Sequence, residues 1–141
     1  MDENPGYRPI GDYAFLSDCH SVALVSREGS IDWCCMPRVD SASVLGRLLD
    51  AERGGYCAVR VEEDVPVSRR YVDDSLVLET TFRAPSGEAR LLDCFTMRRG
   101  GAHAPYRQLL GLIDDFSPVR REEEVQIAVA TFLRAWGAES A

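Results

Sequence analysis

The sequence predicts a mainly β fold, an antiparallel β-sandwich followed by a C-terminal amphipathic α-helix. Short segments rich in β-branched and apolar residues follow one another closely, and turns containing glycine or proline separate them. After Ile113 the pattern changes to a helical period. The strand-rich part is therefore predicted to occupy residues 1–113, and a linker with the C-terminal helix is predicted at residues 114–141.

The first predicted hairpin lies near the N-terminus. Residues 22–25 are apolar and strand-forming, residues 26–30 are a polar turn in which Gly29 accommodates a positive φ, and residues 31–36 resume a strand. Further strands are predicted at residues 56–61, 67–71, 76–83, 88–96 and 106–113, whereas residues 43–49 fit a strand or a helical turn.

The strand predicted at residues 88–96 carries one acidic residue on an apolar face. Ala89, Leu91, Asp93 and Phe95 alternate along it and therefore share that face. Because a buried carboxyl group requires a hydrogen-bond partner, Asp93 is expected to have one.

The C-terminal segment carries the helical pattern. Three glutamates at positions 122–124 suit the first turn of a helix, and Gly137 suits its C-terminal cap. An apolar stripe recurs between them at spacings of three and four residues, formed by Val125, Ala128, Val129, Phe132 and Trp136. We expect this stripe to pack on a sheet of the same chain, or to form a homodimer through Val125, Val129, Phe132 and Trp136.

Composition and charge exclude several function classes. The 141 residues carry a formal net charge of −7 and the pI is about 4.8, which argues against binding to nucleic acid or to an anionic membrane. No apolar run approaches the roughly 20 residues of a transmembrane helix, and the acidic N-terminus is unlike a secretory signal. Five cysteines without CxxC spacing predict reduced thiols in the cytoplasm, and no metal or other cofactor is expected.

Several short motifs together resemble a known enzyme family. They are Ile10-Gly11-Asp12-Tyr13, Gly29-Ser30-Ile31-Asp32-Trp33, Pro37-Arg38 with Asp40-Ser41, and Tyr71 with residues 76–79. In their order and spacing they resemble the N-terminal β-sandwich of glycoside hydrolase family 15, which contains bacterial glucoamylases and trehalase-like enzymes. The resemblance runs from Tyr7 to Ile113.

This resemblance implies a domain without catalytic residues. In the family, a helical barrel follows the sandwich and carries the two catalytic carboxylates, and no position here matches them. The resemblance therefore implies a truncated, partial sandwich that is inactive alone and whose partner is the catalytic barrel. The implied substrates are α-glucosides such as trehalose or maltooligosaccharides. A stand-alone carbohydrate-binding or protein-interaction module is the alternative.

Four residues are candidates for a functional role. Arg38 and Asp40 follow a strand in a loop that, by the resemblance, faces the catalytic domain, where they could form the sugar entrance or the domain interface. They could equally form a local ion pair that holds the loop. Trp33 with Tyr13 could form a sugar-stacking platform, although packing of Trp33 in the sandwich core is the expected role.

Overall fold

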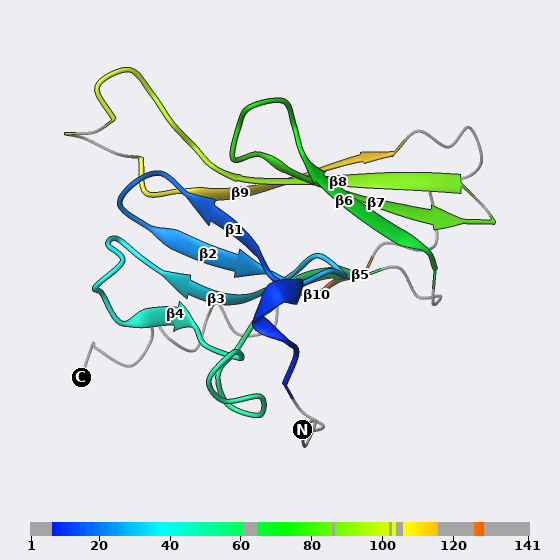
Figure 1. Ribbon diagram of the computed structural model, residues 1–141, viewed down its shortest axis with the longest axis horizontal. Helices are drawn as coiled ribbons and strands as arrows, with labels where there is room; N and C mark the ends of the chain where they lie inside the picture. The colour runs from blue at the N-terminus through cyan, green and yellow to red at the C-terminus, as the bar shows by residue number, and fades with distance from the viewer. Residues whose placement is uncertain are drawn as a thin grey trace.

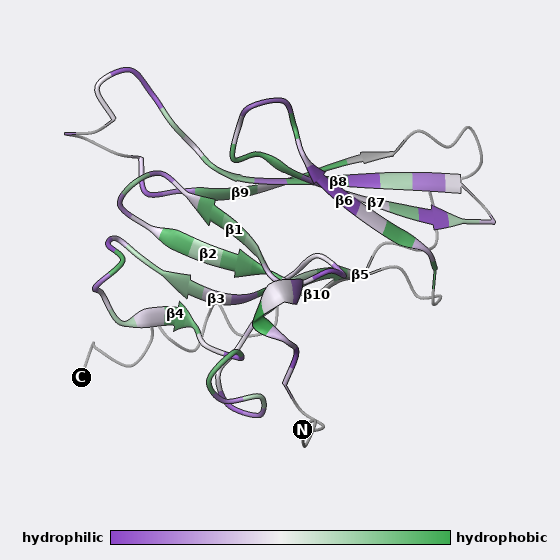
Figure 2. Ribbon diagram, in the orientation of Figure 1, coloured by the Kyte–Doolittle hydropathy of each residue, from purple (hydrophilic) through white to green (hydrophobic). Residues whose placement is uncertain are grey.

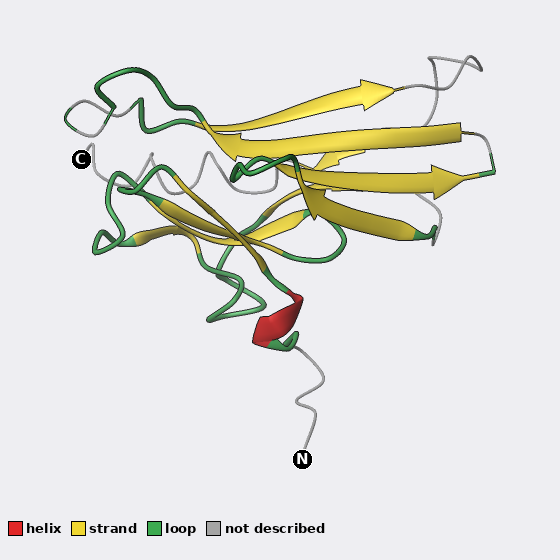
Figure 3. Cartoon of the chain, turned by 45° about the horizontal axis from the view of Figure 1, so that its top comes forward, coloured by secondary structure: helices red, strands yellow, loops and turns green. Residues whose placement is uncertain are grey.

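The computed structural model describes residues 7–60, 65–85, 87–101, 103, 106–115 and 126–128, which form two stacked sheets (Figures 1 and 3). A single 3-10 turn, η1 (Ile10–Asp12), precedes the first strand. The strands are β1 (Ala14–Ser17), β2 (Val22–Val25), β3 (Ser30–Cys35), β4 (Ser43–Leu45), β5 (Cys57–Arg60), β6 (Val67–Tyr71), β7 (Leu78–Ala84), β8 (Gly87–Phe95), β9 (Leu109–Asp115) and β10 (Gln126–Ala128).

Both sheets are antiparallel throughout the described residues. Sheet A has the strand order β1-β2-β3-β5-β10, and β4 pairs with β3 beside this path. Sheet B has the order β6-β7-β8-β9. The predicted antiparallel β fold is therefore confirmed, and residues 43–45 of the ambiguous segment form a strand.

The hydrophobic core lies between the sheets. Along β1, Ala14 and Leu16 are buried while Phe15 between them is 46% exposed, because alternate side chains of a strand point to opposite faces. Figure 2 shows the hydrophobic character of β1 and β2. The buried cluster contains Ala14, Leu16, Ala23, Val25, Ile31, Cys34, Leu45, Leu78 and Phe95.

The structure contradicts the predicted C-terminal helix at three of its positions. Gln126–Ala128 form β10, which pairs with β5 and sets Ile127 opposite Val59. A short isolated helix is only marginally stable in water, whereas these residues extend an existing sheet by pairing with β5, so sheet pairing overrides the helical period here. The remainder of the predicted helix and its proposed dimer contacts, Val125, Val129, Phe132 and Trp136, lie outside the described residues. Among the residues described, no helix is long and apolar enough to cross a membrane.

Candidate functional site

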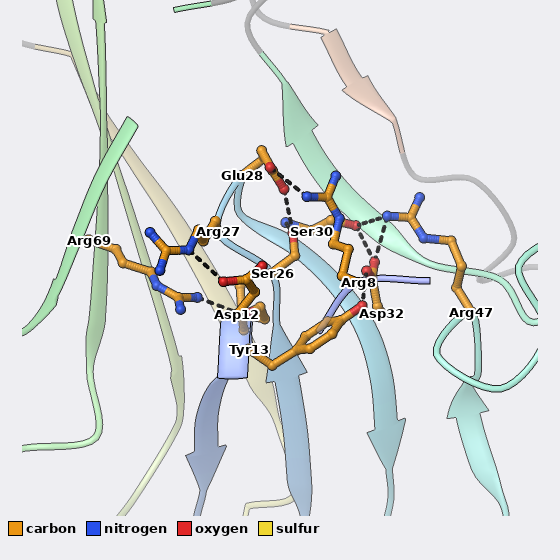
Figure 4. Close-up of polar contacts among 11 residues, drawn as sticks. Arg8, Asp12, Tyr13, Ser26, Arg27, Glu28, Ser30, Asp32, Arg47 and Arg69 are labelled. Atoms are coloured by element: carbon orange, nitrogen blue, oxygen red, sulfur yellow. Dashed lines mark hydrogen bonds and ion pairs between the residues drawn. The ribbon is translucent and has the colours of Figure 1, made fainter. Parts of the chain in front are cut away.

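A buried carboxylate on β3 is the centre of a polar cluster. Asp32 is only 2% exposed. Its Oδ1 accepts a hydrogen bond from Ser30 Oγ at 2.5 Å and lies 2.8 Å from Nη2 of Arg47, while Oδ2 accepts from the Tyr13 hydroxyl at 3.0 Å. Figure 4 shows these side chains converging from three parts of the chain. The carboxylate is thereby satisfied on both oxygens.

An irregularity in strand pairing places Asp32 there. Ile31 lies opposite Val25 and Trp33 lies opposite Leu24, so Asp32 is an extra residue between two consecutive pairs. Such a bulge lets one side chain leave the regular alternation of the strand. The sequence thus accommodates an acidic residue within an otherwise apolar strand by directing it to polar partners.

Arg47 reaches Asp32 from the turn that follows β4. The turn is closed by backbone hydrogen bonds from Gly46 to Gly54 and from Arg47 to Gly55. The guanidinium carbon lies 3.9 Å from the centre of the Tyr56 ring, so the cation also stacks on an aromatic face. Sequence reasoning did not identify Asp32, Arg47 or Tyr56 as site residues. Asp32, an acidic residue flanked by Ile31 and Trp33, was the detectable signal of a buried polar site.

The electrostatics of this cluster favour a fixed structure. Burial, and secondarily the hydrogen bond to Asp32, raises the pKa of Tyr13 to about 12, so the phenol stays a neutral donor. The positive charge of Arg47 compensates the buried charge of Asp32. The cluster therefore holds the N-terminal segment, β3 and the turn after β4 together. Its hydrogen-bonding groups are already committed to one another.

Further polar contacts surround the turn between β2 and β3 (Figure 4). Nη1 of Arg8 lies 2.6 Å from Oε1 of Glu28, and Nε of Arg27 lies 2.8 Å from Oδ1 of Asp12. Arg69 of β6 donates a hydrogen bond to the backbone oxygen of Val25 on β2 at 3.1 Å. These contacts connect η1 to the hairpin turn and sheet B to sheet A.

Trp33 is not in the sandwich core, so that expectation is wrong. It pairs with Leu24, whose neighbours Ala23 and Val25 are core residues, and it therefore lies on the outer face of sheet A. Regular alternation from the buried Ile31 would point Trp33 inward, and the bulge at Asp32 reverses this. Trp33 is half-buried there.

The outer face carries a row of three apolar side chains. Phe15 lies opposite Leu24 on β2, and Leu24 lies opposite Trp33 on β3. Tyr13, the other residue of the expected sugar platform, is half-buried with its hydroxyl bound to Asp32. We call Phe15, Leu24 and Trp33 the outer row.

Arg38 and Asp40 form a two-bond ion pair in the loop between β3 and β4. Nε and Nη2 of Arg38 each lie 2.9 Å from one carboxylate oxygen of Asp40, and both side chains are about two-thirds exposed, at 67% and 64%. The loop is anchored by Ser21 Oγ, which donates to the backbone oxygen of Pro37 at 3.0 Å. Both hydrogen bonds of the pair join residues of the same loop, so the pair is a preformed surface feature.

A second buried carboxyl group lies between the two sheets. Asp93 is 3% exposed, and burial raises its pKa to about 7. Among the described residues its Oδ2 has no hydrogen-bond partner, contrary to the expectation from the sequence. A pKa near 7 is typical of a general acid, but the interior position of Asp93 keeps a substrate away from it. In the same described part of the chain, no group of three or more potential metal ligands comes together.

Comparison with known proteins places this chain in a family. Residues 5–87 match the family described as trehalase-like, N-terminal. The chain is 44% identical over 94 residues to a trehalase of Mycolicibacterium smegmatis, a match that covers 67% of this chain and 14% of that protein. A trehalase of Mycobacterium tuberculosis is 43% identical with the same coverage, and Trehalase 2 of Sulfolobus acidocaldarius is 42% identical over 71 residues, 50% of this chain and 12% of that protein. No solved structure matches the chain. Since the family covers more than half of its residues, the chain belongs to the trehalase-like N-terminal domain family.

Proposed function

We propose that this domain is the non-catalytic N-terminal part of a trehalase-like enzyme of glycoside hydrolase family 15. Its role is to support a catalytic helical barrel that hydrolyses α-glucosides such as trehalose or maltooligosaccharides. The observation that carries the proposal is the match of residues 5–87 to the family, together with relatives called trehalases that it matches over 14% of their length.

The geometry of the buried carboxyl groups supports a non-catalytic role. Hydrolysis of a glycosidic bond with inversion needs two carboxyl groups facing the sugar at roughly 6.5–9.5 Å. Asp32 is neutralised by Arg47, and Glu79 on β7 lies 2.8 Å from Arg70 and 3.5 Å from Arg90. Asp93 lies inside the sandwich. Arginine side chains pair with Asp32 and Glu79, and Asp93 is enclosed by the two sheets, so these groups do not offer a facing pair to a sugar.

A chimeric enzyme tests the supporting role. The matched N-terminal stretch of the Mycolicibacterium smegmatis trehalase is replaced by the corresponding part of this chain, and glucose release from trehalose is measured. We expect the chimera to be soluble and active, the enzyme lacking this stretch to be inactive, and the present chain alone to release no glucose. Turnover by the isolated chain that persists through two different purification schemes would contradict the proposal.

The loop with Arg38 and Asp40 is the part of the domain that we assign to the interface with the catalytic barrel or to the sugar entrance. Its support is the exposed, preformed ion pair and the neighbouring Val39, which is 59% exposed. In the chimera, Arg38→Asp combined with Asp40→Arg keeps a local ion pair but exchanges the positions of the two charges that the catalytic barrel would contact. We expect activity to fall although the domain still folds. The same exchange at Arg8 and Glu28 is the matched control, and equal activity of the two double variants would remove this assignment.

A second candidate function is carbohydrate binding by the outer row. Its support is the placement of Trp33 outside the core and the 46% exposure of Phe15, because aromatic faces pack on apolar sugar faces. Titration of trehalose and maltotriose with tryptophan fluorescence tests it. Binding that is lost in Phe15→Ala and kept in Tyr106→Ala would favour a sugar site. If high concentrations of both sugars leave the tryptophan fluorescence unchanged, carbohydrate binding is excluded and the supporting role stands as the proposed function.

We also infer that the domain functions in the cytoplasm, a reducing compartment. All five cysteines are free thiols, and burial raises the pKa of Cys34 to about 12, which keeps that thiol unreactive. Acid-trapped protein from its own cells should therefore titrate as five thiols. A disulfide in such a preparation would exclude this location.

A further inference from the structure

The outer row is an open apolar surface on sheet A. Phe15 on β1 pairs with Leu24 on β2, and Leu24 pairs with Trp33 on β3, so the three side chains lie side by side. Phe15 is 46% exposed, and Leu24 and Trp33 are half-buried. All three residues belong to the unbroken described stretch from residue 7 to residue 60. The domain therefore presents two large aromatic side chains to its surroundings in a fixed arrangement.

The strand positions that border the outer row, all within this described stretch, add no unpaired charge to it. On one side Ser17, Val22 and Cys35 form the next row of the same face, and all three are buried. On the other side lies Asp32, whose carboxylate pairs with the Arg47 guanidinium. An exposed apolar surface between uncharged and neutralised neighbours is typical of a contact with another folded protein part.

The hydrogen-bonding side chains beside the outer row are bound within the domain. The Ser17 hydroxyl donates to the carbonyl of Ser21 at 2.9 Å and accepts from the amide of Cys19 at 3.0 Å. The Tyr13 hydroxyl donates to Asp32 at 3.0 Å. A sugar site needs convergent polar groups that bind the sugar hydroxyls, because apolar contact alone does not orient a ligand. The surroundings of the outer row therefore suit apolar side chains of a protein better than a sugar.

We propose that the outer row is the surface on which the catalytic part of the enzyme packs, with Phe15 and Trp33 as the buried anchors of that contact. The inference rests on the proposed function and deepens it, because it names the face of the domain that meets the barrel. Aromatic side chains at the centre of a contact, surrounded by groups that are already satisfied, are the usual arrangement of a stable protein interface. Covering the row removes apolar surface from water, which stabilises the contact.

The family match supports the catalytic part as the occupant. All three residues of the outer row lie within residues 5–87, the stretch that matches the trehalase-like family, whereas exposed apolar residues such as Met97 and Leu112 lie beyond it. A surface within this stretch suits a partner that such enzymes share. The match covers 14% of the Mycolicibacterium smegmatis trehalase, so most of that protein is available to cover it. A partner joined in the same chain is also present at a high effective concentration.

The loop that follows β3 gives the contact a polar border. β3 carries Trp33 and ends at Cys35, and the next residues form the loop with the exposed pair of Arg38 and Asp40. The outer row and this loop can therefore meet one partner together. A second copy of the chain fits less well, because a net charge of −7 on each copy opposes self-association.

Hydroxyl-radical footprinting tests the proposal, because it measures how accessible each side chain is to solvent. The full chain is compared with the chimera in which its matched part replaces that of the Mycolicibacterium smegmatis trehalase. We expect Phe15 and Trp33 to be oxidised at least about fivefold more slowly in the chimera, since side chains at the centre of an interface lose contact with water. Leu76, which is 39% exposed between β6 and β7, is the internal control and should be oxidised at the same rate in both proteins.

A charge placed in the outer row provides a second measurement. In the chimera, Phe15→Asp should return the oxidation of Trp33 to the rate of the isolated chain, because a carboxylate buried in an apolar contact opposes that contact. Leu76→Asp is the matched control and should leave Trp33 protected. The Tyr71 hydroxyl binds only backbone atoms of Phe15, so the isolated Phe15→Asp chain should keep a native circular dichroism spectrum.

The results of footprinting separate this inference from the proposed function. An active chimera in which Phe15 and Trp33 are oxidised as fast as in the isolated chain overturns the inference and keeps the supporting role. An inactive chimera removes both. Slower oxidation of Trp33 in the isolated chain after addition of trehalose, or at high chain concentration, would assign the outer row to a sugar or to a second copy and would likewise overturn the inference.

Discussion

The hydroxyl of Tyr71 lies 2.9 Å from both the backbone nitrogen and the backbone oxygen of Phe15. It accepts from the first and donates to the second, so a side chain of β6 in sheet B occupies the outer edge of β1 in sheet A. Together with the bond from Arg69 to the Val25 carbonyl, this contact gives the sandwich a polar attachment between its layers. The apolar core packs without directional preference, and these bonds define how the layers align.

Replacing this tyrosine tests the attachment. Tyr71→Phe keeps the ring and removes both hydrogen bonds, so the free energy of unfolding should fall by about 0.5–1.5 kcal/mol per bond lost. The variant should also aggregate faster, because the edge of β1 is open. Urea unfolding and light scattering measure the two effects. Tyr106→Phe, at an exposed tyrosine whose ring stacks with Arg98, is the control and should behave like the wild type.

The cluster around Asp32 should be more sensitive than the exposed ion pair. Asp32→Ala leaves the Arg47 charge and the Tyr13 hydroxyl without their buried partner, which should cost about 3–5 kcal/mol of unfolding free energy. Asp40→Ala breaks a pair that is mostly exposed and should cost less than about 1 kcal/mol. Chemical denaturation of both variants gives the comparison. Equal losses would mean that the Asp32 cluster is not a structural centre.

Local patterns predicted the hairpin of β7 and β8 well. Its two strands are rich in strand-forming residues and the sequence between them contains proline and glycine, so all the information lies within one short segment. The position of Trp33 could not be obtained in this way. It depends on the bulge at Asp32, which exists because Arg47 and Tyr13 supply partners from elsewhere in the chain.

Non-local pairing also explains the error in the C-terminal segment. The helical period of residues 125–136 is a local signal, whereas the pairing of Ile127 with Val59 connects residues far apart in the sequence. The candidate site shows the same division. Asp32 was not predicted as a site residue, although it is an acidic residue in an apolar strand, and its partner Arg47 depends on a turn closed by bonds that involve Gly46, Gly54 and Gly55.

Because Trp33 lies outside the core, truncating it should cost less unfolding free energy than truncating a smaller residue of the core. Trp33→Ala removes a half-buried side chain from the outer face of sheet A and should cost about 1–3 kcal/mol. Leu16→Ala removes a fully buried side chain of the core and should cost about 2–5 kcal/mol. Thermal unfolding of the two variants ranks them. A larger loss for Trp33→Ala would mean that the indole ring supports the fold from outside the core.

Two glycines approach each other too closely for a side chain. A Cβ at Gly54 would overlap the backbone of Gly46, whereas one at Gly11 would meet nothing within 4 Å. Gly54→Ala should therefore force the turn after β4 apart and cost at least about 2 kcal/mol, and it should displace Arg47 from Asp32. Gly11→Ala is the matched control and should leave stability nearly unchanged. Denaturant midpoints of both variants, measured side by side, decide this.

Asp93 should make the stability of the domain depend on pH. Burial raises its pKa from 3.8 to about 7, so between these values the folded chain retains a proton that the unfolded chain releases. Folding therefore loses up to about 1.4 kcal/mol for each pH unit from about 4 to about 7, and little more above that. The thiols of Cys57 and Cys94 nearby have pKa values raised by burial and stay neutral in this range. Asp93→Asn should flatten the profile of unfolding free energy against pH, while Asp40→Asn should preserve its slope. A profile that keeps its full slope in Asp93→Asn would assign the pH dependence to another group.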